Sequence, residues 1–223
     1  AATLESRYQK TFTYDALNRM TVSTITSNIA STSGVFNGTS WVAYSGASAS
    51  IKTQYAYDAF GNVTRTTDAE GNITWSYYDA LGRKTAQVDG EGYLTTWEYN
   101  ADGNVTWEHR YANKSVGDPA LGIPGADGSG DNRHTSFSYD LVGNRTGETR
   151  HNVLVHDGVG NQVYTAATIS YLYNGLGQVI RKTYANSGDQ INYTYDAGGR
   201  LTLEQRQSYV DQSGATVTPT VEY

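Results

Sequence analysis

The 223-residue sequence contains no cysteine, three prolines and one methionine, and only 17% of its residues are charged. Without cysteine the chain can form no disulfide, no cysteine-ligated zinc site and no thiol nucleophile. A net charge of −6 with no basic cluster argues against nucleic acid or an anionic membrane surface as a partner. No apolar run is long enough for a membrane-spanning helix, so membrane insertion is not predicted.

Aromatic residues are plentiful by contrast, with 19 tyrosines and four tryptophans. They suit a thin sheet in which rings pack along one face while the tyrosine hydroxyls reach water. No apolar stripe with the helical period continues for three turns, so no α-helix is predicted. These features favour an all-β fold.

One short sequence recurs seven times. It starts with Tyr, continues with Asp or Asn, and places Gly (Asn in the first copy) three residues after that, as in YDAFGNVT from Tyr57. The Tyr residues lie 43, 21, 21, 40, 34 and 22 residues apart, which indicates a tandem array with a unit of about 21 residues. The gaps of 43 and 40 are interpreted as two units each, with a degraded middle copy. The repeated positions are Tyr14, Asp15 and Asn18; Tyr57, Asp58 and Gly61; Tyr78, Asp79 and Gly82; Tyr99, Asn100 and Gly103; Tyr139, Asp140 and Gly143; Tyr173, Asn174 and Gly177; and Tyr195, Asp196 and Gly199.

The repeat has the chemistry of a hairpin turn. An Asp or Asn followed by a residue that tolerates positive φ predicts a four- or five-residue loop, with the Asx side chain accepting backbone N–H bonds. Positive φ is predicted at Gly61, Gly82, Gly103, Gly143, Gly177 and Asn18. Further turns are predicted at Asp68, Asp89, Asn37-Gly38, Asp157-Gly158, Ser187-Gly188 and Ser213-Gly214.

The residues around each turn are those of strands. An aromatic residue three positions before the Asx shares a strand face with the repeated Tyr. After the turn, apolar residues alternate at period two around a Thr, such as Thr21 between Met20 and Val22. The aromatic positions are Phe12, Tyr55, Trp97, Phe137, Tyr171 and Tyr193.

The Y-D-x-x-G-R/N-x-T repeat closely resembles the YD repeat of bacterial RHS proteins, of the BC component of insecticidal toxin complexes, of wall-associated polymorphic toxins and of animal teneurins. The resemblance implies tandem antiparallel β-hairpins in a continuous curved sheet, part of a spiral shell that encloses or presents a toxin. It implies one array over residues 1–223, with a Gly/Pro-rich loop inserted at 113–132 and the toxin domain outside the chain. The expected partners are flanking repeats or neighbouring copies at the strand edges, and the enclosed toxin domain. The expected location is secreted or at the bacterial cell surface. DPALG at Asp118 departs from the family's D-P-x-G cleavage motif, so no self-cleavage is expected.

Other candidate sites compete with simpler explanations. Asp127, Ser129 and Asp131 alternate as oxygen ligands in a calcium loop would, although an ordinary turn explains them as well. The four histidines are interpreted as exposed strand and loop positions. No acidic pair stands out from its counterparts in other repeats, so neither a catalytic residue nor a cofactor is predicted. An extracellular adhesion or glycan-binding module, with exposed rings stacking on sugars, remains the alternative function.

Overall fold

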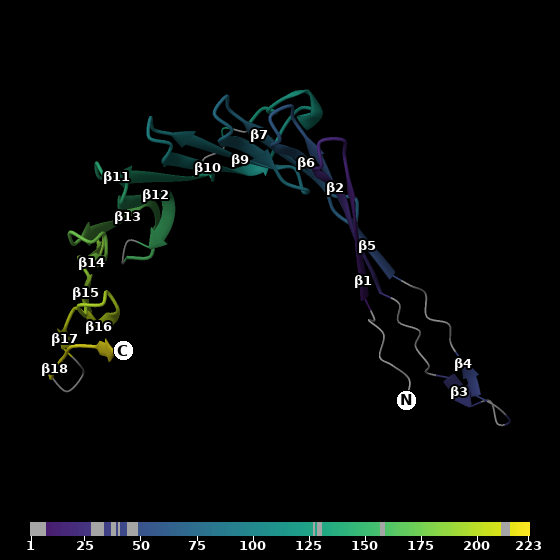
Figure 1. Ribbon diagram of the computed structural model, residues 1–223. Coiled ribbons are helices and arrows are strands. Elements are labelled where there is room, and N and C mark those ends of the chain that lie inside the picture. The colour runs from purple at the N-terminus through teal and green to yellow at the C-terminus, as the bar shows by residue number, and fades with distance from the viewer. Residues whose placement is uncertain are drawn as a thin grey trace. The chain divides into compact units, whose positions relative to one another are not determined.

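The computed structural model describes residues 8–27, 34–36, 39, 41–43, 49–126, 128, 131–156, 159–210 and 215–223 (Figure 1). The chain divides into two compact units, which are described separately. The first comprises residues 1–92 with 118–124, and the second comprises residues 93–117 with 125–223. A single array spanning 1–223 therefore stays a prediction. The turns predicted at Asn37-Gly38, Asp157-Gly158 and Ser213-Gly214 lie outside the described residues.

The first unit contains a meander of antiparallel strands. Its sheet runs in the order β1 (Tyr8–Tyr14), β2 (Met20–Ser27), β5 (Ala49–Tyr57), β6 (Val63–Thr67), β7 (Ile73–Tyr78) and β8 (Lys84–Val88). A separate two-stranded hairpin is formed by β3 (Gly34–Phe36) and β4 (Trp41–Ala43). A 3₁₀ turn, η1 (Pro119–Leu121), belongs to the inserted segment 118–124.

The second unit continues the same construction along the sequence. Its strand order is β9 (Tyr93–Tyr99), β10 (Val105–Lys114), β11 (Arg133–Tyr139), β12 (Arg145–His156), β13 (Gln162–Tyr173), β14 (Val179–Tyr184), β15 (Gln190–Tyr195), β16 (Leu201–Arg206) and β19 (Thr220–Glu222). A short hairpin of β17 (Tyr209–Val210) and β18 (Thr216–Val217) stands apart from this order. Every pair in both units is antiparallel, which confirms the predicted all-β array of tandem hairpins.

The interpretation of the two long gaps was wrong. β2 pairs directly with β5, and the strands described between them, β3 and β4, form a separate two-stranded sheet. β10 likewise pairs directly with β11, and the residues between them form the predicted inserted loop. Each long gap is therefore one unit lengthened by an insertion. Strand pairing restricts the length of the strands but not the length of the segment that connects them.

Little of the sheet is buried. In the described part of the chain, the buried apolar residues are Ala86, Val88, Leu94 and Ile191. Most rings are half-buried on a single-layer sheet, so cross-strand side-chain pairs are the main unit of stabilisation. Among the described residues, no helix has the length and apolar character to cross a membrane.

Candidate functional site

The seven repeated turns have one backbone conformation. Asn18 has φ +61°, and Gly61, Gly82, Gly103, Gly143, Gly177 and Gly199 have φ between +75° and +92°, so the predicted positive φ values are confirmed. Across each turn the Asx N–H bonds the carbonyl four residues later, and the Gly or Asn N–H bonds the Asx carbonyl. Asp68 and Asp89 open turns in which Gly71 and Gly92 also have positive φ. Gly188, at the turn predicted from Ser187, has φ +77°.

The Asx side chain stabilises its own turn, as the sequence predicts. In the turn of Asp79, Oδ1 accepts the N–H groups of Leu81 and Arg83, each at 2.9 Å. The same pair of bonds recurs at Asp15, Asp58, Asp68, Asp140, Asn174 and Asp196. At Asn100 the bond from Asn104 N–H is present at 2.9 Å.

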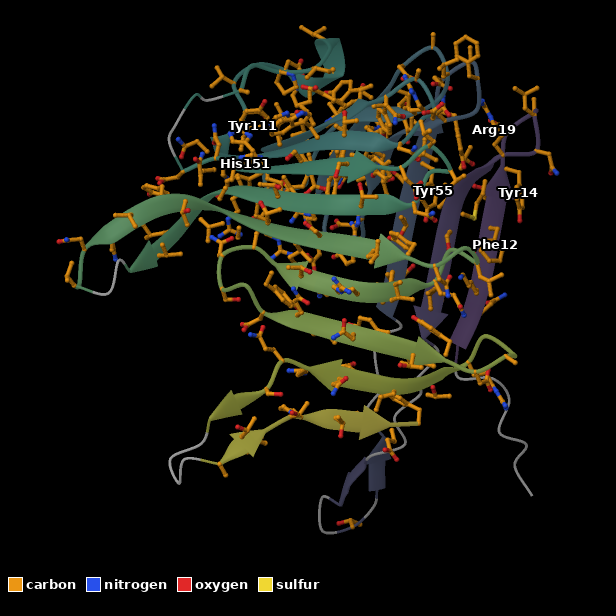
Figure 2. The ribbon with its side chains drawn as sticks, turned by 90° about the vertical axis from the view of Figure 1, so that its left-hand side faces the viewer. Phe12, Tyr14, Arg19, Tyr55, Tyr111 and His151 are labelled. Carbon is orange, nitrogen blue, oxygen red and sulfur yellow. The ribbon has the colours of Figure 1, made fainter. Side chains whose placement is uncertain are left out.

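The residue after the turn glycine has a role that the sequence reading missed. Arg83 Nε donates to the second carboxylate oxygen of Asp79 at 2.7 Å, and Asn144 Nδ2 does the same to Asp140 at 2.8 Å. These bonds explain why Arg or Asn follows the glycine. Arg19 in the first copy also reaches the next repeat, where Nη1 donates to the Asp58 carbonyl at 2.8 Å. Figure 2 shows Arg19 at the turn end of β1.

Hydrogen bonding lowers the pKa of the turn carboxylates below their usual value. The pKa of Asp58 is lowered mainly by the Asn62 side-chain amide, and that of Asp79 mainly by the Arg83 N–H. The pKa values of Asp15, Asp68, Asp140 and Asp196 are lowered by the same kinds of bond. These groups are thus charged structural acceptors near neutral pH, whereas a general acid needs a raised pKa.

The repeated Tyr joins one repeat to the one before it. Its hydroxyl donates to the backbone carbonyl of the residue five positions after the Asx of the preceding copy. The bonds run from Tyr57 to Met20 (2.7 Å), Tyr78 to Val63 (3.0 Å), Tyr139 to Val105 (2.8 Å), Tyr173 to Arg145 (2.8 Å) and Tyr195 to Val179 (2.9 Å). The expectation that these hydroxyls reach water was therefore wrong. A phenol at this distance from the next strand's carbonyl forms a direct bond.

The repeated Thr occupies a β-bulge. Tyr57 pairs with Val63 and Ala56 pairs with Arg65, so Thr64 is an extra residue on its strand. Its Oγ1 lies 3.4 Å from the Ala56 carbonyl, and the Thr202 hydroxyl donates to the Thr194 carbonyl at 3.0 Å. The register shifts at the same position in all seven copies. The plain period-two alternation predicted here does not hold, because two residues oppose one at a bulge.

Rings on the strands contact neighbouring side chains. Phe12 and Tyr14 project from β1, and Tyr55 projects from β5 (Figure 2). The guanidinium of Arg145 lies 5.5 Å from the ring centres of both Phe137 and Tyr171. These cation–π contacts link the aromatic residues of successive repeats.

The inserted loop at 113–132 is an ordered turn in the part that belongs to the first unit. Asp118 caps η1, where its Oδ1 accepts the Ala120 N–H at 2.9 Å. The Tyr77 hydroxyl donates to the Pro119 carbonyl at 2.7 Å. Asp127 and Ser129 lie outside the described residues, and the carboxylate of Asp131 accepts from the Tyr164 hydroxyl at 3.1 Å. The calcium hypothesis therefore stays a prediction.

Three of the four histidines are not exposed, contrary to the prediction from the sequence. His109, His134 and His151 are half-buried and occupy neighbouring strands of the second unit, while the side chain of His156 is outside the described part. Within the described residues, no group of three or more His, Asp or Glu side chains is arranged to hold a metal ion. The cross-strand register, which a single sequence does not reveal, brings these histidines together.

Taken together, the turn, the bulge and the tyrosine bond define a tandem β-hairpin repeat protein in which the tyrosine of five copies bonds to the copy before it. A family model described as "RHS Repeat" matches residues 39–73, 78–116 and 173–217, which together make up more than half of the chain. The chain belongs to the RHS repeat family. No curated protein matches its sequence.

Two solved structures are similar over most of this chain. One is TcdB2-TccC3 without its hypervariable C-terminal region, with 17% identity, a TM-score of 0.49, and coverage of 92% of this chain and 11% of that chain. The other is the pore of the Photorhabdus luminescens Tc holotoxin, with 18% identity, a TM-score of 0.46, and coverage of 90% of this chain and 11% of that chain. Both TM-scores are below 0.5. The chain spans about a ninth of the length of either solved chain.

Proposed function

We propose that this chain is a structural, non-catalytic stretch of wall in an RHS-type shell, which encloses or presents a toxin or effector domain lying outside the chain. The observation that carries the proposal is the bond from the Tyr of one repeat to the backbone of the preceding repeat. A contact that recurs in the same form from copy to copy extends a sheet in one direction, as in other repeat proteins. Membership of the RHS repeat family supports the same role.

The polar side chains that a catalytic function would need are already engaged in the turns. Both carboxylate oxygens of Asp79 accept hydrogen bonds, and the equivalent bonds recur in other copies. No enzymatic activity is therefore expected. Purified protein should be inactive in hydrolase, nuclease and transferase screens, and a turnover that one point substitution abolishes would contradict this part of the proposal.

The alternative, a glycan-binding or adhesion module, would present a solvent-facing row of rings. Trp75, Trp97 and Trp107 are half-buried, and each contacts a neighbouring side chain. Arg65 lies 5.7 Å from the Trp75 ring centre, and Trp97 Nε1 donates to Glu108 at 3.1 Å. These contacts favour a wall over a sugar platform, and binding on a glycan array would favour the alternative.

The terminal strands provide the proposed contacts with further repeats. β1 ends the strand order of the first unit, and β19 ends that of the second. An edge strand presents unpaired N–H and C=O groups, which flanking repeats or a neighbouring copy can cover by β-augmentation. Pro219, directly before β19, lacks an N–H and limits pairing at that position. A secreted or cell-surface bacterial location is part of the same proposal.

The decisive experiment uses the full-length protein encoded by the gene from which this chain comes. Electron microscopy should show a hollow particle whose wall includes these repeats. A domain inside it should resist trypsin in buffer and become cleavable once mild denaturant opens the wall. A domain that is cut immediately in buffer, or an open particle with no interior, would contradict the proposal.

A further inference from the structure

His109, His134 and His151 form a row across three neighbouring strands of the second unit. His109 on β10 is the cross-strand partner of His134 on β11, and His134 is the partner of His151 on β12. Side chains placed directly opposite on one face interact strongly, and like charges there are destabilising. The three residues are called the histidine row below; Figure 2 labels His151.

The closest contact in the histidine row constrains its protons. Nδ1 of His109 lies 2.6 Å from Nδ1 of His134, and the two rings meet edge to face with centres 4.8 Å apart. At this distance one nitrogen donates its proton and the other must offer a lone pair. Two imidazolium rings would bring two N–H groups together, which the contact does not allow.

One positive charge on the pair can be accommodated. His109 Nε2 lies 3.4 Å from the Glu98 carboxylate on β9. A doubly protonated His109 would therefore face Glu98 with one N–H and donate the other to neutral His134. The second proton, the one that charges His134, must break the contact.

Trp107 contacts the two outer members of the row. Its ring stacks on His109 at 5.4 Å and on His151 at 5.1 Å between centres. His151 Nε2 also lies 3.0 Å from Ser136 Oγ. The pKa of His134 is lowered by burial and then by the charges of His109 and His151.

The other charged side chains nearby are paired with one another or project from adjacent strand positions. Glu108 bonds Arg110 at 2.6 Å, and Arg150 bonds Glu148 at 3.1 Å. Arg133 precedes His134 and so points to the opposite face of β11. On β13, the stretch Thr165–Ala167 that follows β12 in the sheet contains no titratable residue. Glu98 is therefore the carboxylate that faces the row.

The histidine row lies beside the closed base of the inserted loop. Asn132, two residues before His134, is only 4% exposed. Its side-chain oxygen accepts the Ala112 N–H at 2.8 Å, and its carbonyl accepts from Asn152 Nδ2 at 3.3 Å. Asn152 directly follows His151, so these bonds join β10, β11 and β12 at the same level as the row.

We propose that the histidine row is an acid-sensitive site, at which protonation of His134 separates β10 from β11 and loosens the base of the inserted loop. Above the ordinary histidine value of 6.5 the row is intact, and its contribution to stability is fully present. Because the folded pKa of His134 is depressed, that contribution is lost as the pH falls from 6.5 through the lowered value.

The test combines histidine-ring NMR titration with amide hydrogen exchange on the 223-residue chain between pH 7.5 and 5.0. After correction for intrinsic exchange, protection of the β10–β11 amides should fall by about tenfold for each unit that the His134 pKa lies below its ordinary value. His134→Gln keeps an amide that can bond His109 and does not titrate, so it should remove the pH dependence. His156→Gln, on the same strand as His151, is the matched control and should retain it.

A second variant keeps the test decisive if His134→Gln does not fold. His109→Gln removes the partner that competes with a proton on His134, so the His134 titration should move up toward 6.5. A wild-type His134 that titrates at or above 6.5, or β10–β11 protection that does not change with pH, would overturn the proposal. An effect that disappears on addition of EDTA would also overturn it, since a bound metal would then be the cause.

Discussion

The two ends of the hairpins differ in how much variation they allow. At the end that carries the repeated sequence, each of the seven connections, from Asp15–Arg19 to Asp196–Arg200, is five residues long. At the opposite end, β6 and β7 are joined by five residues, whereas β2 and β5 are joined by the segment 28–48 and β10 and β11 by 115–132. The first end is constrained because the bulge and the tyrosine contact depend on its geometry as well as the Asx bonds. At the opposite end Asp68 accepts the same Asx bonds, but the bulge and the tyrosine contact belong to the first end, so the length of the opposite end can change.

The largest effect that tests this contrast concerns two glycines in one repeated turn. Gly177 has φ +75°, whereas Gly175 has open space around a Cβ and no positive φ. Gly177→Ala should destabilise the chain by roughly 1 kcal/mol or more, because a Cβ clashes in the left-handed region. Gly175→Ala should stabilise it by about 0.4–1 kcal/mol through the unfolded state. Urea unfolding measures the free energy of unfolding of both variants. Equal effects would contradict the proposed constraint on the repeated turn.

The next effect concerns the bond between repeats. Tyr139→Phe removes the hydroxyl that donates to the Val105 carbonyl and should cost about 0.5–1.5 kcal/mol in the free energy of unfolding. Tyr14→Phe is the matched control, since the Tyr14 ring is 55% exposed and its hydroxyl has no hydrogen-bond partner within the described residues. Its effect should be within about 0.5 kcal/mol. Equal losses at the two positions would show that the tyrosine contact adds no stability.

A smaller effect should appear only in acid. The pKa of Asp140 is lowered, first by the Asn144 side chain, so the contribution of this carboxylate to stability is present above about pH 4 and is lost as the pH falls through the lowered pKa. Asp140→Asn retains the acceptor, as Asn174 does at the same position, and should flatten the decline in stability between neutral pH and pH 2. Urea midpoints at several pH values measure this. An unchanged acid slope would mean that the turn bonds do not act through the charged carboxylate.

The smallest effect on global stability should come from the inserted loop. Tyr77 bonds the loop at Pro119, while the adjacent Tyr78 bonds the preceding repeat at Val63. Tyr77→Phe should increase protease cleavage within 115–126 while changing the unfolding free energy by less than about 0.5 kcal/mol. Tyr78→Phe should lower the unfolding free energy by more than about 0.5 kcal/mol and leave protease cleavage within 115–126 unchanged. Identical behaviour of the two variants would mean that the two ends of the hairpins are equally constrained.

The local chemistry of the turns could be predicted from the sequence, whereas contacts between repeats could not. Asn18 was recognised as the counterpart of the turn glycines because αL tolerance is a property of the single residue. The acceptor of Tyr139 is 34 residues away at Val105, and finding it requires the order of the strands in space. Thr64 was assigned to ordinary alternation because a bulge changes the register without changing the residue types.

Insertions also limited the sequence reading. The spacing of 43 residues predicts two units, because length alone cannot distinguish a degraded repeat from a long connection. The histidine row could not be predicted either, because it depends on the register of strands that are separated by an insertion. His109 and His134 are opposite each other only because the inserted loop returns the chain to β10 in that register.

The tyrosine contact gives the array a direction. Each described donor lies later in the sequence than its acceptor, so each of these tyrosines bonds to a repeat that is synthesised before it. Domains fold from the amino terminus during synthesis, and an unpaired strand edge is prone to aggregate while it waits. Backward-reaching hydroxyls therefore let the growing chain add one hairpin at a time onto the edge strand that was formed last.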